Sequence, residues 1–373
     1  MVMILKNDDM KRVKSILLIL LSMIIGIGCD KKETEFYPKE IKINLEEGKD
    51  IEIQPDRIIP LETSDSSLIY DIGAMAVYDN ELVIQSRSFM KVFDRATGHY
   101  LRDISCKGDG PGEYLSLTQF WNDGDTLKII DFNAGLIRSY MRDGLPLEET
   151  VDLKTIEGKD LYQPQYVVET PDKKGYCIIN CFRGGVDYNP QFSFLTKDFK
   201  FKNNVPGREL QEGGHTPDRM FTDFKKNRIL AWEQLRDTLF QVDENGVTPL
   251  YVFNFGKNSF PEKFQSLTDL WERSQEFMKN KDGVPYASFI KYYQTSGDNL
   301  FFSFITSTND VYLGRYNEAK DQIKIFRLND PRNKYRQSLF YKIIDKGLLI
   351  ALSPIDPTES NPSLYFLKFS EIE

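Results

Sequence analysis

The stretch NELVIQSRSFMKVFDRATGHYLRDI, Asn80–Ile104, decides the fold class. It begins with a polar turn and a short apolar run at Leu82–Ile84. A second strand pattern follows at Met90–Asp94, the turn Ala96–Gly98 reverses the chain, and a third strand pattern follows at Tyr100–Ile104. Short runs of apolar, aromatic and β-branched residues separated by glycine-containing turns predict consecutive antiparallel strands.

The opening of this stretch, a polar turn followed by a strand, recurs along the chain. The copies are Asn80–Ile84, Gly124–Ile130, Lys174–Ile179, Asn227–Trp232, Gly297–Phe302 and Lys346–Ala351. They are spaced roughly 45 to 55 residues apart, with one longer step of about 70. A period of roughly 40 to 50 residues with several strands per unit is typical of β-propellers. We therefore predict an all-β, six-bladed β-propeller.

Hairpin turns within the units indicate four antiparallel strands per blade, A to D. Asp143-Gly144 and Asn245-Gly246 each separate two strand patterns. Both dipeptides favour tight hairpins, because their residues accept a positive φ.

The last unit ends one strand early, because Ser363–Lys368 is its third strand and no fourth follows. Two segments near the start, Ile41–Leu45 and Ile58–Leu61, have the pattern of a spare strand. We predict that one of them supplies strand D of the last blade. This would close the ring and remove an open sheet edge.

The long step between the fourth and fifth units contains a helical pattern at about residues 259–281. Ser259 and Glu262 form a candidate capping box, Pro261 stands in the first turn, and apolar residues follow at helical spacing. The sequence predicts one inserted helix, either a lid over one face of the disc or an insertion packed on its side.

The N-terminus has the three parts of a secretory signal. Basic residues precede the apolar run Ile16–Ile27, which is short for a bilayer span of roughly 20 residues. Gly26-Ile27-Gly28-Cys29 resembles the lipobox of bacterial lipoproteins, although Gly26 stands where that family usually has Leu. The resemblance implies cleavage before Cys29 and acylation of its thiol and amine, and several acyl chains anchor a protein stably.

The predicted organisation is a signal peptide at residues 1–28, a tether at 29–38 and the propeller at 39–373. Two alternatives to the lipoprotein remain, which are ordinary secretory cleavage after Gly28 and an uncleaved membrane anchor. The lipoprotein reading places the protein in the cell envelope, anchored to the outer membrane.

Composition excludes several classes of function. The formal net charge of −8 argues against a broad basic patch and hence against nucleic acid as a partner. After Cys29 the cysteines are Cys106, Cys177 and Cys181, an odd number that does not form a disulfide framework. With two histidines in the chain, a Cys/His zinc site is poorly supported, and we expect small buried thiols.

A glycine-rich motif stands between the first two units, Lys107-Gly108-Asp109-Gly110-Pro111-Gly112-Glu113-Tyr114. It lacks the Gly-Lys-Ser/Thr ending of a phosphate loop. Together with Ile59–Thr63 it resembles a family of six-bladed propeller lipoproteins of Bacteroides-like bacteria, related to NHL-repeat propellers. In that family such a loop closes the first blade. We expect a steric role for the glycines, with Glu113 accepting backbone hydrogen bonds from a neighbouring blade.

Antiparallel geometry places the B–C loops and the D–A crossings on one face of the disc. We predict that a ligand or protein partner binds on this loop face, around the channel mouth, because arginine clusters suit carboxylates, phosphates or sulfated sugars. The candidate residues are Arg87, Gly108, Gly110, Pro111, Glu113, Asp131, Asn133, Arg183 and Arg236. The alternative is that these arginines are solvated or pair with blade carboxylates.

Two functions compete. The first is a non-catalytic binding or scaffolding module of the envelope, with an unknown protein or carbohydrate as its ligand and the membrane contacted through the lipid. The second is a propeller enzyme, either a calcium-dependent lactonase-like hydrolase or a glycan-cleaving enzyme with paired carboxylates. Carboxylates that could hold calcium by residue type are Asp71, Asp123, Asp125, Asp131 and Glu169. No spacing marks a catalytic residue, and no other cofactor is indicated.

Overall fold

The computed structural model divides the chain into two units, residues 1–37 and 38–373. The structure describes residues 37–70, 72–104, 107–154, 156, 164–181, 190–207, 219–232, 235–267, 270–279, 284–331, 335–344, 346–354 and 360–372. Cys29, Cys106 and Arg183 lie outside these ranges. The second unit is a six-bladed β-propeller of antiparallel four-stranded blades, as the repeat predicts.

The first three blades take their four strands from consecutive sequence. Blade 1 consists of β4 (Ala74–Val77), β5 (Glu81–Ser86), β6 (Phe89–Asp94) and β7 (Tyr100–Asp103). Blade 2 consists of β8 (Leu117–Asp123), β9 (Thr126–Asp131), β10 (Leu136–Met141) and β11 (Pro146–Asp152). Blade 3 consists of β12 (Pro164–Glu169), β13 (Gly175–Cys181), β14 (Pro190–Thr196) and β15 (Phe201–Pro206).

The last three blades include strands from the start of the unit. Blade 4 consists of β16 (Arg219–Asp223), β17 (Arg228–Trp232), β18 (Thr238–Asp243) and β19 (Gly246–Asn254), joined by β1 (Lys39–Lys42). Blade 5 consists of β20 (Ala287–Ser296), β21 (Asn299–Thr306), β22 (Val311–Asn317) and β23 (Gln322–Asn329), joined by β2 (Lys49–Glu52). Blade 6 consists of β24 (Tyr335–Ile344), β25 (Gly347–Pro354), β26 (Ser363–Lys368) and β3 (Ile58–Pro60).

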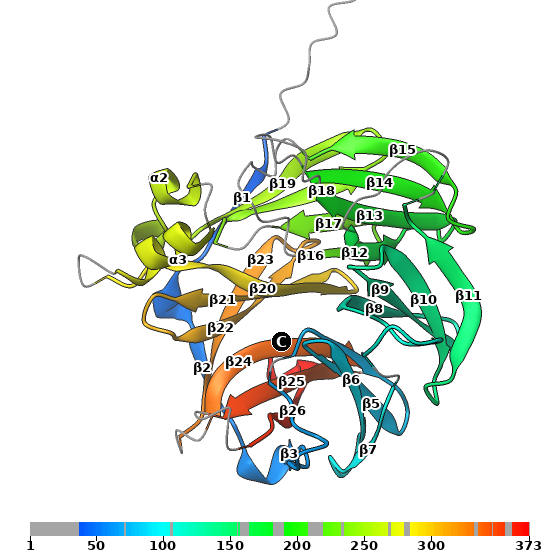
Figure 1. The fold of residues 1–373 in the computed structure, drawn as a ribbon. Coiled ribbons are helices and arrows are strands. Elements are labelled where there is room, and N and C mark those ends of the chain that lie inside the picture. The colour runs from blue at the N-terminus through cyan, green and yellow to red at the C-terminus, as the bar shows by residue number, and fades with distance from the viewer. Residues whose placement is uncertain are drawn as a thin grey trace, which may run out of the picture. The chain divides into compact units, whose positions relative to one another are not determined.

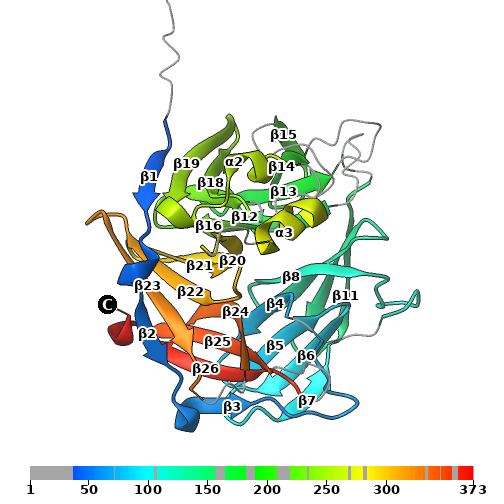
Figure 2. The same cartoon turned by 90° about the vertical axis from the view of Figure 1, so that its left-hand side faces the viewer.

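Residues 39–60, which we call the strap, run along the outer edges of blades 4, 5 and 6 in turn (Figures 1 and 2). β3 pairs antiparallel with β26 and is strand D of blade 6, so the prediction of an N-terminal closing strand is confirmed for the Ile58–Leu61 candidate. The other candidate, Ile41–Leu45, contributes to β1, which lies parallel to β19.

The strap contains a short internal repeat that matches the blades. Ile41 pairs with Phe253 of β19, and ten residues later Ile51 pairs with the corresponding Leu328 of β23. A 3-10 helix follows each strand, η1 (Leu45–Glu47) and η2 (Pro55–Arg57). The strap therefore advances one blade for each ten residues.

Apolar packing between neighbouring blades provides the core. Strand side chains alternate between the two sheet faces, and each face packs against the next blade. Ile53 is fully buried in the largest such cluster, with residues of blades 5, 6 and 1. Cys177 is fully buried between blades 3 and 4, and burial raises the pKa of its thiol, so it behaves as a core residue.

The insertion between blades 4 and 5 differs from the prediction, because it forms two short helices, α2 (Glu262–Gln265) and α3 (Leu270–Met278). The expected capping box is absent, since the Ser259 hydroxyl instead accepts a hydrogen bond from the Phe255 amide at 2.9 Å. A small cluster including Leu235, Phe260 and Phe277 packs the insertion onto the loop face of blades 4 and 5. No helix in the described ranges is long and apolar enough to cross a membrane.

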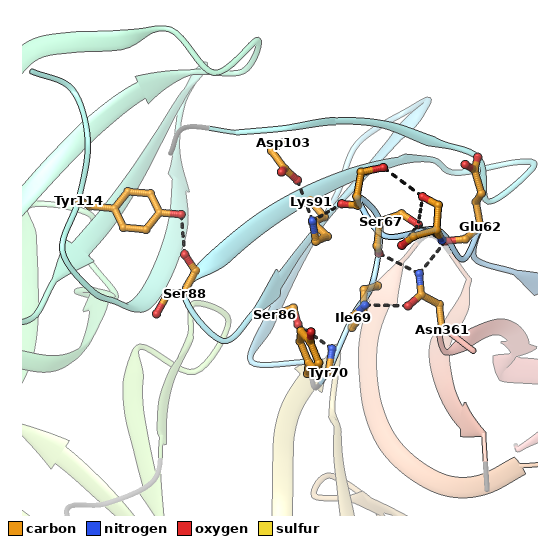
Figure 3. A network of polar contacts seen from close by, with 12 residues as sticks. Glu62, Ser67, Ile69, Tyr70, Ser86, Ser88, Lys91, Asp103, Tyr114 and Asn361 are labelled. Atoms are coloured by element: carbon orange, nitrogen blue, oxygen red, sulfur yellow. Dashed lines mark hydrogen bonds and ion pairs between the residues drawn. The ribbon is translucent and has the colours of Figure 1, made fainter. Parts of the chain in front are cut away.

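Hydrogen bonds fix the junction between the last and first blades (Figure 3). The buried Asn361 side chain donates to the carbonyls of Glu62 and Ser67 at 2.6 and 2.9 Å, and it accepts from the amide of Ile69 at 2.7 Å. The ammonium of Lys91 binds the Ser66 carbonyl and the Asp103 carboxylate. These bonds hold the crossing that follows β3 and so lock the closed ring.

Candidate ligand-binding channel

The inner strands of the six blades surround a central cavity of about 610 Å³. Its walls include residues of β4, β8, β12, β16, β20 and β24, the A strands of the blades, which Figure 2 shows grouped around the centre. Each of these strands contacts the A strands of the two adjacent blades, so the wall is continuous around the ring. Volumes of about 300 to 1,000 Å³ are usual for small-molecule sites.

The register of the A strands defines two tiers of side chains along this wall. Two A-strand residues in different blades are equivalent when they pair with strand-B residues at the same distance from the start of strand B. One tier, which we call the lysine tier, consists of Ala76, Trp121, Val168, Phe221, Gln294 and Lys342. The next, the polar tier, consists of Val77, Asn122, Glu169, Thr222, Thr295 and Ile343. All twelve residues line the cavity, so every blade contributes to both tiers.

Lys342 is the only charged member of the lysine tier. Its ammonium has no hydrogen-bond or ion-pair partner among the described residues, although its side chain is partly enclosed by the wall. Burial lowers the pKa of Lys342, because the surroundings disfavour the charged form and no acid offsets this cost. An uncompensated cation facing a cavity is unusual, and such groups concentrate at functional sites.

Glu169, the only charged member of the polar tier, has its charge compensated from outside the cavity. Lys197 lies 2.7 Å from its carboxylate and also donates to the hydroxyl of Tyr176 at 3.1 Å. That hydroxyl donates to Asp123 at 2.8 Å. Burial raises the pKa of Tyr176 to about 12, so the phenol stays protonated and holds this network together. Among the described lining residues, the charge without an ion-pair partner is therefore the positive one on Lys342.

Amide side chains join the inner strands of neighbouring blades. Gln119 of β8 donates to the Val167 carbonyl at 2.8 Å and accepts from the Val167 amide at 2.6 Å. Gln294 of β20 accepts from the amide of Ile343 at 2.8 Å. Neighbouring A strands belong to different sheets, and these glutamine side chains bond one A strand to the backbone of the next. They therefore fix the distance between neighbouring A strands.

Partly exposed aromatic rings form the apolar part of the channel wall. Trp121, Tyr166 and Phe221 are partly exposed, and Phe224 is exposed near the end of β16. Aromatic rings facing a cavity offer flat apolar surfaces to a ligand. The channel thus combines flat apolar surfaces with one free positive charge.

The residues predicted on the loop face make mostly local contacts. The Glu113 carboxylate accepts from the Gly110 amide of its own loop at 2.9 Å, not from a neighbouring blade as expected. A Cβ on Gly108 would lie 1.9 Å from that carboxylate, so a larger residue there would displace the Glu113 side chain. Pro111 stands in the same loop, which connects β7 to β8.

Two further predicted residues belong to the β9–β10 turn. Asp131 is fully buried and accepts from the amides of Leu115 and Ser116 at 3.1 and 3.0 Å. The amide of Asn133 donates to the Ser116 hydroxyl at 2.7 Å, while its side chain is exposed. Both residues hold the turn against the preceding crossing.

The predicted arginines are distributed over separate blades. Arg87 follows β5 with a φ of 51° and its guanidinium lies 4.2 Å from the ring centre of Tyr70. Arg236 precedes β18 of blade 4 and is partly buried. With Arg183 outside the described residues, a shared arginine site on the loop face stays a prediction.

Sequence reasoning missed Lys342 because one lysine in an alternating strand pattern resembles any exposed strand lysine. The sequence did contain one signal. Lys342 stands shortly before the turn between strands A and B, and the equivalent positions in blades 2 and 4 are occupied by the aromatic residues Trp121 and Phe221. In the described part of the chain, no three His, Cys, Asp or Glu side chains converge to form a metal site.

The family model described as a domain of unknown function, DUF4934, matches residues 39–361, nearly the whole propeller. The chain belongs to the DUF4934 family. No curated protein matches its sequence significantly. The DUF4934 match covers the strap, all six A strands and Lys342.

Two solved structures share the fold. An exported protein of Bacteroides fragilis is 18% identical, with a TM-score of 0.61, covering 88% of this chain and 99% of its own. A DUF4221 family member from Bacteroides vulgatus is 12% identical, with a TM-score of 0.53, covering 83% and 95% respectively. At these identities the likeness concerns the fold alone.

Proposed function

We propose that this protein is a non-catalytic binding module of the bacterial cell envelope, which holds a small ligand in its central channel. The observation that carries the proposal is the cavity of about 610 Å³, walled by two tiers to which every blade contributes. A packed structural core would fill this space, because protein interiors leave few voids larger than a water molecule.

The location in the envelope rests on the N-terminal sequence and on a relative. The signal-like segment and Cys29 support export and lipid anchoring, and the similar B. fragilis structure is of an exported protein. In this proposal the lipid is attached at Cys29 and the tether leads directly into the strap. Incorporation of labelled palmitate into the full chain, lost in Cys29→Ser, tests the anchor.

A plugged channel tests the binding site. Thr295 lies in the polar tier and is partly exposed, so Thr295→Trp would occupy part of the cavity. The matched control is Thr248→Trp on the exposed surface of β19. Chains starting at residue 29 with Cys29→Ser would be screened against envelope glycans and metabolites by thermal shift, and hits would be measured by calorimetry.

We expect at least one ligand whose affinity falls tenfold or more in Thr295→Trp and is unchanged in Thr248→Trp. Binding that is indifferent to both substitutions would place the ligand elsewhere on the molecule and contradict the proposal. Turnover of a bound ligand by the unsubstituted chain would contradict its non-catalytic part.

A further inference from the structure

Among the described residues, Lys91 and Lys128 are buried lysines, and comparing them with the partly buried Lys342 isolates Lys342. Lys91 is 7% exposed and pairs with Asp103 at 3.1 Å. Lys128 is 4% exposed and lies 3.4 Å from both the Ser139 hydroxyl and the Glu149 carboxylate. Removing a charge from water costs several kcal/mol unless a partner offsets it. Lys91 and Lys128 have such partners within the chain, whereas Lys342 has none in the described ranges.

The contrast is sharpest between Lys342 and Lys128, which lie at the same register level but on different strands, Lys342 on strand A of blade 6 and Lys128 on strand B of blade 2. Lys128 faces Trp121 of the lysine tier on the neighbouring strand of blade 2, just as Leu349 faces Lys342 in blade 6. The lysine that points toward the outer strands has an acid, and the one on the channel wall has none among the described residues. A negatively charged group that enters the channel would therefore meet an unpaired ammonium at Lys342.

The charge of that group is inferred from Lys342. Glu169 is paired with Lys197, which also lies 3.7 Å from Asp123, so Lys342 is the described lining residue whose charge has no ion-pair partner. A single ammonium is a point charge that suits a monoanion, while doubly charged phosphate is usually bound by several cationic groups or helix N-termini.

The other residues that line the cavity indicate the chemistry of the uncharged part of the ligand. Trp121 and Phe221 belong to the same tier as Lys342. Both are partly exposed residues of the cavity lining that also pack against apolar clusters between blades, so they add apolar surface for a ligand ring. The polar tier adds Asn122 and Thr295. The Asn122 carbonyl accepts from the Tyr78 hydroxyl, which leaves its amide hydrogens for a ligand hydroxyl. A ring with an apolar face, hydroxyl groups and one anionic substituent satisfies all these groups.

We propose that the channel binds an acidic sugar, a ring that carries one negative charge as a uronate carboxylate or a sulfate monoester, with that charge paired to Lys342. This inference rests on the proposed function, because it names the ligand class of the same cavity. Lys342 is then a specificity residue, and the aromatic and polar tiers position the sugar ring.

The test compares acidic sugars with a neutral match. The Cys29→Ser chain starting at residue 29 would be titrated with a glucuronate-containing disaccharide, its methyl ester and a monosulfated disaccharide. The variant is Lys342→Met, and the matched control is Lys128→Met, which removes a paired lysine outside the cavity. A thermal melt of each variant shows that it is folded, and Lys342→Gln replaces Lys342→Met if the latter does not fold.

We expect the uronate or the sulfated sugar to bind at least tenfold more tightly than the methyl ester, and this preference to vanish in Lys342→Met but not in Lys128→Met. The preferred sugar identifies the anion. Affinity should also fall as pH rises and Lys342 loses its proton, and Lys342→Arg should remove that pH dependence.

Three results would overturn the inference: equal binding of the acid and its ester, an acid preference that survives in Lys342→Met, or no binding of any of the three sugars. If these occur while another ligand loses affinity in Thr295→Trp, the binding function stands and only the ligand class is wrong. If no ligand responds to Thr295→Trp, the channel itself is wrong as the site.

Discussion

The two halves of the ring are built differently. Blades 1 to 3 have four strands each from consecutive sequence, while blades 4 and 5 have a fifth strand and blade 6 borrows its fourth. The outer strands reflect this difference. β11 has exposed side chains at five of seven positions, whereas β19, which β1 covers, has one exposed position of nine. The strap therefore protects the edges of one half only.

This difference shows that the same segment, the strap, both closes the ring and covers the sheet edges of two blades. A propeller whose chain ends one strand short needs an N-terminal strand for closure alone. In this protein the segment that provides it first covers two other sheet edges, and exposed edges are the usual site of unwanted pairing. Blades 4 to 6 thus depend on residues far away in sequence, and blades 1 to 3 do not.

Deleting residues 38–61, which removes the whole strap, should have the largest effect on stability. Blade 6 loses strand D, which pairs with β26, and the apolar core around Ile53 becomes exposed. We expect no cooperative unfolding transition and aggregation on expression, measured by circular dichroism during heating. A shorter deletion of residues 38–44 removes only β1 and should leave a folded ring. Normal melting after the long deletion would show that closure does not need the strap.

Ile53→Ala should destabilise the protein by roughly 2 to 5 kcal/mol, because it opens a cavity at a fully buried site where the strap meets blades 5 and 6. Leu153→Ala provides the matched change in the other half, since Leu153 is also fully buried. Hydrogen exchange should show faster exchange in β2 and β23 for Ile53→Ala alone. Uniform acceleration around the ring would contradict the separation of the halves.

Asp237 gives blade 4 a pH dependence. It is 5% exposed and accepts from Gln265 of α2 at 2.9 Å and from Ser288 at 3.1 Å, and burial raises its pKa to about 7. Because the folded pKa exceeds the unfolded value, its contribution is full below about pH 4 and is lost as pH rises through 7. We expect Asp237→Asn to remove a stability decrease on the order of 4 kcal/mol over this window.

Chemical denaturation at pH 4, 5.5, 7 and 8 measures this effect. The difference between the unsubstituted chain and Asp237→Asn should grow steadily from pH 4 to 7 and stay constant above it. A difference that is the same at all four pH values would show that Asp237 has an ordinary pKa.

Asn361→Ala should cost about 2 kcal/mol, because the substitution leaves two carbonyls and one amide of the closing crossing without their partner. Asn133→Ala is the matched control, an exposed asparagine in the loop of blade 2, and should change stability by less than about 0.5 kcal/mol. Urea titration of both variants measures this, and equal costs would remove the special role of the junction.

The sequence predicts the blades well, because each one is encoded locally by short strands and turns such as Asp143-Gly144. It predicts β3 as a closing strand because the last unit is visibly incomplete. It does not predict that β1 and β2 pair as fifth strands with blades that already have four. A parallel strand at a sheet edge is not joined to its neighbour by a hairpin turn, so the sequence lacks the turn signal that marks the other strands. Aligning Lys39–Asn44 with Lys49–Gln54 would have revealed the repeat.

The candidate site is harder to predict than the fold. Glycine-rich loops and arginines stand out in sequence, but Gly108 and Glu113 hold their own loop. Lys342 becomes distinctive only when six strands are placed in register around one axis. Its lack of a partner is a property of the assembled ring and not of any local pattern. The helical insertion is confirmed in its position, but it forms two helices where one was predicted, and Ser259 bonds the Phe255 amide where a capping box was expected.

The ten-residue spacing of the strap restricts the length of its linking segment. Ile41 and Ile43 of the first strand and Ile51 and Ile53 of the second must all point toward the core. The segment between them, Asn44–Gly48, therefore has a set length. Loss of one residue there would turn the second pair of isoleucines to solvent, since side chains alternate along a strand. Length changes in this segment should therefore be tolerated only as whole repeats, which ties the number of covered blades to the number of ten-residue units.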